Sequence, residues 1–295
     1  MEARHWKADG LLLITALIWG SAFVAQRVGM DNVGPFTFNG VRFALGALSL
    51  QPLIWWMQRT RRREGGGEGI SSARLILCGL VAGCVLFGGA ALQQVGIVYT
   101  TAGKAGFITG LYVVMVPLFG LALGQRAGTG TWTGAILAAV GLYLLSVTED
   151  FGIAYGDLLE LVGAVFWAGH VLIIGRLSPG MDATDAVKLA AAQFVVCSVL
   201  SLAAGAVTET VTLAGLRGAM APILYGGLMS VGVAYTLQVV AQRDADPAHA
   251  AIILSLEAAF AALTGYLVLG EVLSLRAMLG CGLMLGGMLL SQLKQ

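Results

Sequence analysis

The sequence predicts an all-α integral membrane protein with ten transmembrane helices, arranged as two inverted five-helix repeats. Three observations support this prediction: the composition, the number of long apolar stretches, and a similarity between the two halves of the chain. An inverted repeat of this kind is an architecture of secondary transporters.

The composition excludes most classes of soluble protein. Of the 295 residues, 58% are hydrophobic and only 11% are charged, with a formal net charge of +1 and a mean hydropathy of +0.85. A soluble domain carries about 25% charged residues, so this chain lacks the polar surface that a soluble fold needs. The near-neutral charge disfavours a nucleic-acid partner. The 42 glycines, about twice the usual share, suit helices that pack closely in a membrane.

Ten stretches reach the roughly 20 mainly apolar residues that a spanning helix requires. In order they are 9–28, 35–57, 75–96, 102–123, 130–148, 156–176, 186–207, 219–241, 247–270 and 274–292. The one long connection, 58–73, contains three consecutive arginines and three consecutive glycines and is expected to be a flexible charged loop. No cleavage site follows the first stretch, so a retained helix is expected there rather than a signal peptide.

The Lys and Arg residues of the connections predict the orientation. With the amino terminus in the cytoplasm, twelve of them fall inside and four fall outside, namely Arg27, Lys104, Arg217 and Arg276. An excess of Lys and Arg marks the cytoplasmic side. Both termini are therefore predicted to be cytoplasmic, and the resemblance described below implies the bacterial inner membrane as the location.

Two pairs of short segments relate the halves of the chain. Ala-Leu-Ile-Trp-Gly at 16–20 resembles Ala-Val-Phe-Trp-Ala at 164–168, at an offset of 148 residues. Leu-Ala-Leu-Gly-Gln at 121–125 resembles Leu-Val-Leu-Gly-Glu at 267–271, at an offset of 146. These matches predict one five-helix repeat in residues 1–148 and a second in 149–295. An odd number of crossings inverts the second repeat, and two such halves can rock around a site at the midplane.

The sequence lacks the motifs of ATP-driven and metal-dependent chemistry. It has no GxxxxGK[ST] loop, no HExxH, and no Cys/His cluster with metal-ligand spacing. We expect no cofactor, no metal and no enzymatic activity. The expected partners are a small-molecule solute and the lipid bilayer, and the chain is compatible with a monomer.

Several short motifs follow one another along the whole chain. They are Leu-Ile-Trp-Gly-Ser-Ala-Phe at 17–23, Asn-Gly-Val-Arg-Phe at 39–43, Leu-Glu-Ala at 256–258 and Leu-Gly-Glu-Val-Leu at 269–273. In this order they resemble the EamA-type branch of the drug/metabolite transporter superfamily. That family usually has Leu-Glu-Pro where this chain has Ala258, and here Pro117 follows Tyr112 by five residues. Any kink in these two helices is therefore expected to be absent or displaced.

The resemblance implies a secondary transporter that exports small metabolites by alternating access around a central cavity. Within the family the sequence is similar to amino-acid exporters, which implies aromatic or other neutral amino acids as cargo. A multidrug or other metabolite exporter is an alternative. A phosphorylated cargo is disfavoured because no Lys/Arg pair lies near the midplane. An intramembrane enzyme or an ion channel is a further alternative, although Glu257 and His170 are too few groups for an active site.

Ionisable groups inside the apolar stretches are candidate functional residues, because they are costly in a membrane. Glu257 lies close to the midplane and can hold a substrate ammonium group or carry a proton. Arg42 is a candidate gate or structural charge, paired with an acid or with backbone carbonyls. Glu160 lies near one end of the stretch 156–176, where its carboxyl can reach water. Replacing Glu257 by Gln is expected to depress transport.

Aromatic and amide side chains complete the predicted pathway. Trp19 and Trp167 occupy equivalent places in the two halves and can floor a central cavity, or simply pack. His170, three residues after Trp167, is a proton carrier or a packing residue. The other predicted residues carry hydroxyl, amide or amino groups that can bind a zwitterion or join helices: Gln94, Tyr99, Gln238 and, at the outer mouth, Lys104.

Overall fold

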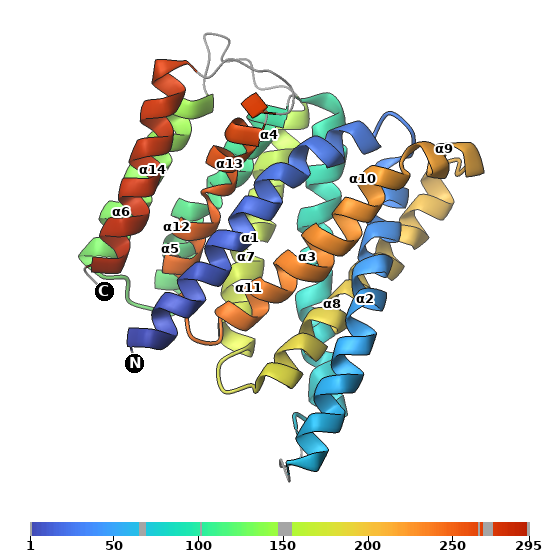
Figure 1. Ribbon diagram of the computed structural model, residues 1–295. Coiled ribbons are helices and arrows are strands. Elements are labelled where there is room, and N and C mark those ends of the chain that lie inside the picture. Colours follow the sequence, from blue (N-terminus) through green and yellow to red (C-terminus); the bar gives the residue numbers. More distant parts are fainter. Residues whose placement is uncertain are drawn as a thin grey trace.

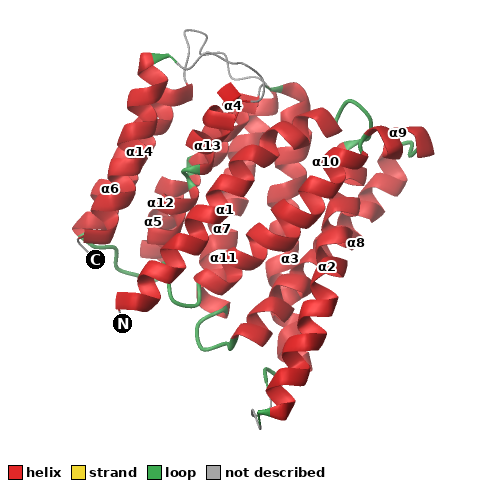
Figure 2. Cartoon of the chain, viewed as in Figure 1, coloured by secondary structure: helices red, strands yellow, loops and turns green. Residues whose placement is uncertain are grey.

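The protein is described by a computed structural model that covers residues 2–64, 69–100, 102–146, 155–264, 266–267 and 274–293. Within these residues every regular element is a helix, which confirms the predicted all-α class. The helices lie side by side in one bundle, with both termini at the same end (Figures 1 and 2).

The helices follow the predicted apolar stretches closely. The first half holds α1 (Glu2–Gly29), α2 (Pro35–Arg63), α3 (Ser72–Tyr99), α4 (Ala102–Gly110), α5 (Tyr112–Ala122) and α6 (Thr129–Ser146). The second half holds α7 (Tyr155–Leu177), α8 (Ala183–Thr208), α9 (Leu213–Gly218), α10 (Met220–Leu224), the π-helix η1 (Tyr225–Tyr235), α11 (Thr236–Ala241), α12 (Pro247–Leu254), α13 (Glu257–Thr264) and α14 (Leu275–Leu293).

Six of the described segments are long and apolar enough to cross a membrane. They are Trp6–Gly29, Ser72–Tyr99, Tyr155–Leu177, Ala183–Thr208, Met220–Ala241 and Pro247–Thr264. Shorter apolar helices occupy Ile108–Ala122, Thr129–Leu144 and Met278–Ser291. The helix α2 is long enough but less apolar, because Asn39, Arg42 and Gln51 interrupt its apolar residues. The number of crossings therefore stays a prediction, while the class of helical membrane protein holds.

Three predicted stretches differ from a continuous α-helix. Between α4 and α5 the helix is interrupted at Leu111, whose amide donates to Ile108, three residues back instead of four. Between α12 and α13 the interruption falls at Ser255 and Leu256, and the Leu256 amide likewise donates to Ile253. The eighth stretch stays helical but widens into η1, a form often found at functional sites.

Neither interruption coincides with a proline. Pro117 lies inside α5, and the residue after Glu257 is alanine. At the second interruption the Ser255 hydroxyl donates to the Ile252 carbonyl over 2.8 Å, a local bond that competes with the helical ladder. Both helices are thus interrupted without a proline at the break: Leu111 lies six residues before Pro117, and Ser255 and Leu256 lie directly before Glu257.

The connection 58–73 is more helical than its composition suggests. The helix α2 continues to Arg63, so the arginines extend it beyond the membrane-spanning part. Arg59 lies over the Trp55 ring at 3.9 Å, and Arg has a good helix propensity. Residues 65–68 lie outside the described part of the chain. The connection between α2 and α3 is therefore shorter than the loop predicted over 58–73.

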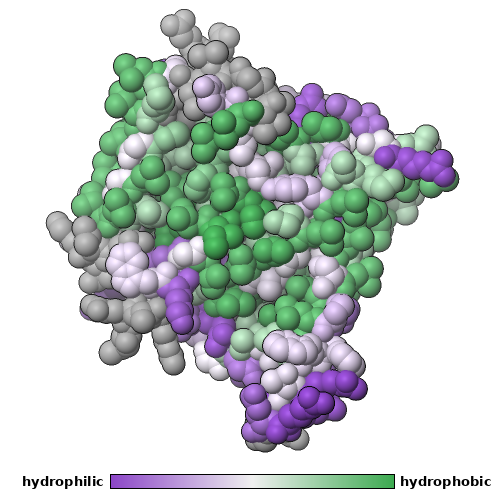
Figure 3. Space-filling model, viewed as in Figure 1, coloured by the Kyte–Doolittle hydropathy of each residue, from purple (hydrophilic) through white to green (hydrophobic). Residues whose placement is uncertain are grey.

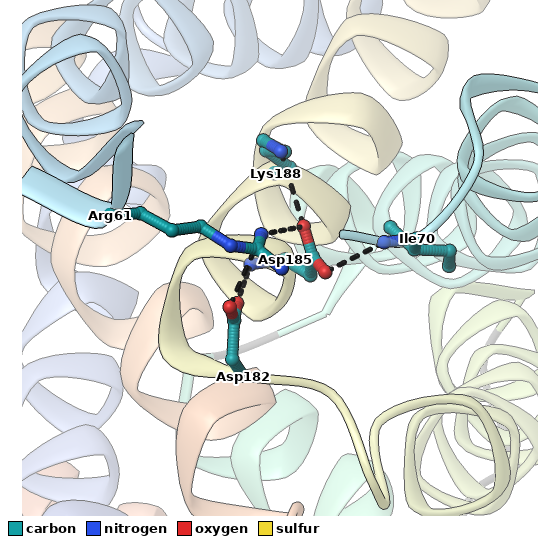
Figure 4. Close-up of polar contacts among 5 residues, drawn as sticks. All are labelled: Arg61, Ile70, Asp182, Asp185 and Lys188. Atoms are coloured by element: carbon teal, nitrogen blue, oxygen red, sulfur yellow. Dashed lines mark hydrogen bonds and ion pairs between the residues drawn. The ribbon is translucent and has the colours of Figure 1, made fainter. Parts of the chain in front are cut away.

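A cluster of charges ties this end of α2 to the second half of the chain (Figure 4). The buried carboxylate of Asp185, near the start of α8, accepts from the Ile70 amide at 2.8 Å and from Lys188 at 3.1 Å. Arg61 lies 3.4 Å from Asp185 and 3.2 Å from Asp182. Asp182 also caps α8 by accepting from the Asp185 amide. These contacts hold the α2–α3 connection against the α7–α8 turn.

The packing leaves an apolar outer surface. The helix α14 lies along α6, α2 lies along α8, and α3 packs against both α7 and α8 (Figure 1). Side chains such as Leu48, Ile76, Val199 and Leu279 point away from the bundle and are exposed. Figure 3 shows an apolar belt between two ends where hydrophilic residues gather, one of them at the tip of α2. Such a belt is suited to contact with lipid.

Candidate functional site: a central cavity

Three aromatic rings meet at the centre of the bundle. The Tyr235 ring, at the end of η1, lies 4.5 Å from the Trp19 ring on α1 and 6.2 Å from the Trp167 ring on α7. The indole Nε1 of Trp19 donates to the Ser230 carbonyl over 3.2 Å. The buried indole Nε1 of Trp167 has no partner among the described atoms. The two tryptophans that the sequence relates to one another thus meet around one tyrosine.

These rings form part of the wall of a cavity between the two halves of the chain. The cavity has a volume of about 30 Å³, which admits water but no amino acid. Its lining comes from α1 to α5 and from α7, η1, α11, α12 and α13: Trp19, Phe23, Gln26, Arg42, Gln93, Thr109, Tyr112, Trp167, Val171, Ser230, Tyr235, Gln238, Leu254 and Glu257.

Glu257 enters the cavity because the helix is interrupted just before it. It is the first residue of α13 and is 5% exposed, and the cavity lining also contains Tyr112, whose hydroxyl has no hydrogen-bond partner among the described atoms. Tyr112 is in turn the first residue of α5, after the interruption at Leu111. Each interrupted helix therefore presents the first residue of its second segment to the cavity.

Arg42 reaches the cavity from α2 and is 3% exposed. Its guanidinium carbon lies 5.4 Å from the Phe38 ring centroid and 5.2 Å from that of Phe43, distances at which a cation and a ring attract. Among the described residues no carboxylate lies within ion-pair distance of Arg42, and its Nε has no hydrogen-bond partner. The cavity therefore holds a buried cation that the described part of the protein leaves uncompensated.

Glycines allow the helices to approach closely beside both charges. A Cβ on Gly20, next to Trp19, would lie 2.5 Å from the Glu257 carbonyl oxygen. A Cβ on Gly227 of η1 would lie 3.0 Å from the Arg42 carbonyl oxygen and 2.8 Å from Leu45. Larger residues at these places would push α1 from α13 and η1 from α2, and so displace the charged side chains.

Amides add hydrogen-bonding groups to the lining. The Gln93 amide donates to the Gln26 side chain over 3.2 Å. Gln238 is 1% exposed, and its Oε1 has no partner among the described atoms. An unpartnered acceptor in a buried wall is costly, so the cavity is suited to a ligand or to water that donates hydrogen bonds.

Five of the nine predicted residues line this cavity, three lie elsewhere, and the side chain of one falls outside the described part of the structure. The lining contains Trp19, Trp167, Gln238, Glu257 and Arg42.

His170 lies behind the aromatic wall, where its Nε2 meets the Gln193 Oε1 at 2.8 Å and its ring packs edge-on against Trp167. Gln94 is buried between α3 and α1 and donates to the Gln26 carbonyl. Tyr99 is exposed at the end of α3 and packs on Tyr155. Their roles in the pathway stay predictions.

Lys104 belongs to α4, but its side chain lies outside the described part of the structure. The expectation that it attracts a carboxylate at the outer mouth therefore stays a prediction.

The prediction for Glu160 was wrong in one respect. Its side chain is completely buried and does not reach water. The reason is tertiary, because Gly96 of α3 brings the two helices together over it, and a Cβ there would lie 2.8 Å from the Glu160 Oε1.

Some lining residues were not among the site residues predicted from the sequence. Tyr235 and Tyr112 lie in apolar stretches that give no sign of which tyrosine faces inwards. Gln26 lies at the seventh position after Trp19, on the same face of α1, and that spacing was the available signal. Ser230 is placed by the π-helix, which the residue pattern does not reveal.

A bundle of apolar helices that surrounds buried charges and amides is the architecture of a membrane transporter. The chain belongs to the EamA-like transporter family, whose model matches residues 6–147 and again residues 154–293. It is therefore a multi-pass membrane transporter of the drug/metabolite superfamily and not an enzyme.

Relatives agree with this assignment. An uncharacterized transporter of Archaeoglobus fulgidus is 34% identical over 270 residues, covering 90% of this chain and 80% of that protein. The inner membrane transporter YedA of Escherichia coli K12, also named as uncharacterized, is 26% identical and covers 90% of this chain and 84% of its own length. A protein of known crystal structure has the same fold, with a TM-score of 0.76 at 18% identity over 97% of this chain and 96% of its own.

Proposed function

We propose that the protein exports neutral amino acids, aromatic ones included, across the bacterial inner membrane by alternating access around the central cavity. One observation carries this proposal: a buried guanidinium, Arg42, and a buried carboxyl group, Glu257, line the same cavity without forming an ion pair. A zwitterion carries the two complementary charges.

The chemistry of each group fits one end of an amino acid. The planar guanidinium of Arg42 can hold a carboxylate through two parallel hydrogen bonds. The carboxylate of Glu257 can hold the ammonium group, with Tyr112 beside it. The rings of Trp19, Trp167 and Tyr235 offer an apolar surface for the side chain of the cargo. A neutral amino acid would then satisfy charges that are otherwise costly inside a membrane.

The small volume supports a mechanism in which the halves move. A cavity of about 30 Å³ must widen to admit an amino acid, and inverted repeats widen such a site on alternate sides. The two matches of the family model, 6–147 and 154–293, support repeats over 1–148 and 149–295. The interruptions at Leu111 and Leu256, which are 145 residues apart, support them further. Interrupted helices at corresponding places are typical of transporter sites.

The distribution of Lys and Arg residues supports an orientation with both termini in the cytoplasm. The printed name of YedA, an inner membrane transporter, supports the location. The end of the bundle opposite the termini is then the outer face (Figure 1).

Counterflow in liposomes tests the proposal. Purified protein is reconstituted, the vesicles are loaded with one unlabelled amino acid, and the entry of labelled L-phenylalanine, L-alanine or L-lysine is followed. We expect saturable exchange of the neutral amino acids and none in protein-free vesicles. Absence of exchange for every amino acid tested would contradict the substrate assignment.

An exporter of cationic drugs is the second candidate, because Glu257 and the aromatic rings alone suit an apolar cation. Arg42 separates the two functions. If the cargo is an amino acid, replacing Arg42 by Gln should abolish its exchange. If the cargo is a cationic drug, the same variant should still transport a quaternary ammonium dye.

A further inference from the structure

A second buried carboxyl group lies near the cavity without lining it. Glu160, on α7, is completely buried, and its Oε2 accepts from the Thr109 hydroxyl over 3.1 Å. Its Oε1 has no hydrogen-bond partner among the described atoms. The close approach of α3 at Gly96 and α4 at Thr109 excludes bulk water from this carboxyl group.

Glu160 lies between the cavity and the end of the bundle that is away from both termini. On one side Thr109 both bonds to Glu160 and lines the cavity that contains Glu257. On the other side Asp157 lies one turn earlier on α7, and the Thr100 hydroxyl at the end of α3 donates to it. Hydrogen-bonding groups thus follow one another from the cavity towards the end that lies away from both termini.

The described surroundings of Glu160 offer each protonation state one neutral hydrogen-bond partner, the Thr109 hydroxyl. The ionised carboxylate has one neutral donor, Thr109 from α4, and no cation among the described side chains within ion-pair distance. The other described charge that acts on it is Asp157 from its own helix, while α3 faces it with the backbone at Gly96. A protonated carboxyl can donate to the same hydroxyl, because a threonine hydroxyl accepts as well as donates. Such a group is suited to gain and lose a proton in turn.

We propose that Glu160 is a proton-binding site between the central cavity and the outer face, and that its protonation couples transport to a proton gradient. A proton enters past Asp157, binds the Glu160 carboxylate, and leaves by way of Thr109 to the water of the cavity. There it reaches Glu257, whose neutral carboxyl releases the ammonium group of the cargo. One O–H bond breaks and another forms at each step, and one proton moves inwards as one zwitterion leaves.

The proton site can be tested without any cargo. Infrared difference spectra are recorded on the reconstituted full-length protein while the pH is changed, and the carbonyl band of protonated carboxyl groups is followed. We expect one band to disappear in Glu160→Gln and to persist in Glu64→Gln, a matched control at the exposed end of α2. Identical spectra for Glu160→Gln and the wild type across the pH range would overturn the proposal.

The coupling rests on the proposed function and has its own test. Vesicles are loaded with labelled L-phenylalanine, and its movement is followed with and without a pH gradient. In Glu160→Gln we expect gradient-driven movement to be lost while counterflow without a gradient is retained. Glu64→Gln should behave as wild type in both measurements.

The outcomes distinguish the two proposals. If Glu160→Gln keeps gradient-driven movement, or loses counterflow to the same degree, coupling through Glu160 is wrong. If the wild type moves no amino acid, the substrate assignment fails, and the infrared experiment still decides whether Glu160 binds a proton.

Discussion

The indole ring of Trp167 stacks on the phenol ring of Tyr235, with centroids 6.2 Å and ring planes 27° apart. One ring comes from α7 and the other from the π-helix η1, and both line the central cavity. The pair therefore adds aromatic surface to the cavity wall.

Trp167→Leu is expected to weaken transport of aromatic cargo selectively. An aromatic pair contributes about 0.5–1.5 kcal/mol beyond its apolar area, which corresponds to a rise in KM for L-phenylalanine of roughly twofold to tenfold. The KM for L-alanine should change little, because its side chain does not reach a ring. Initial rates of exchange for the two amino acids measure the difference. An equal rise for both would contradict a stacking role.

Arg42→Gln is expected to abolish exchange of L-phenylalanine, because the cargo carboxylate would be buried without its partner. Truncating one member of a buried charge pair costs about 2–5 kcal/mol. Arg42→Lys should retain partial activity, since it keeps the charge and loses the planar fork. L-phenylalaninamide, which has no carboxylate, should bind wild type and Arg42→Gln equally in a competition assay. Binding of L-phenylalanine, but not of the amide, to Arg42→Gln would contradict this role.

Glu257→Gln preserves the size of the side chain and removes its charge. We expect exchange of L-phenylalanine to be depressed strongly, because the ammonium group loses its counter-ion. N-acetyl-L-phenylalanine, whose nitrogen is uncharged, should not be transported even by the wild type. Wild-type exchange by correctly folded Glu257→Gln would remove this residue from the mechanism.

Gly20→Ala is expected to destabilise the protein. The new Cβ would lie 2.5 Å from the Glu257 carbonyl oxygen and 2.6 Å from the Phe260 Cβ, and such overpacking costs about 1–3 kcal/mol. Gly10→Ala on the same helix is the matched control, since nothing lies within 4 Å of its added Cβ. Thermal unfolding in detergent compares the two variants. Equal midpoints would show that α1 and α13 can separate without cost.

Asp185→Ala is expected to lower the free energy of unfolding by about 2–3 kcal/mol, because it leaves the Ile70 amide without its acceptor and removes the carboxylate that Arg61 and Lys188 share. Asp31→Ala serves as a control. Its ion pair with Arg27 is largely exposed, and such pairs contribute about 0–1 kcal/mol. Denaturant titrations measure the free energy of unfolding of both variants. An equal decrease for Asp185→Ala and Asp31→Ala would show that the Asp185 cluster does not hold the α2–α3 connection in place.

Much of the fold was predictable because the membrane restricts it. A chain with so few charges has to bury its backbone polar groups in helices, and the limits of those helices follow from runs of apolar residues. The helical extension of α2 to Arg63 was missed, because Arg59 stacks on Trp55 and Arg61 meets Asp182 and Asp185. These contacts stabilise a helix that the local pattern presents as a loop.

The candidate site was predictable only where a residue is unusual for its surroundings. Glu257 and Arg42 are charges in apolar stretches, and the Trp19 and Trp167 motifs repeat, so each carries its own signal. Tyr235, Tyr112 and Ser230 resemble many other residues of the chain, and their place depends on two interruptions and a π-helix.

The sequence by itself determined that this is a helical membrane protein, the approximate position of its apolar segments, and which charges are costly enough to matter. Only the tertiary structure decided that Arg42 and Glu257 face one cavity, that Tyr235 meets both tryptophans, and that Glu160 is sealed from water. The physical reason is that hydropathy depends on each residue alone, whereas burial and pairing depend on how closely distant helices approach, which here is governed by glycines such as Gly20, Gly96 and Gly227.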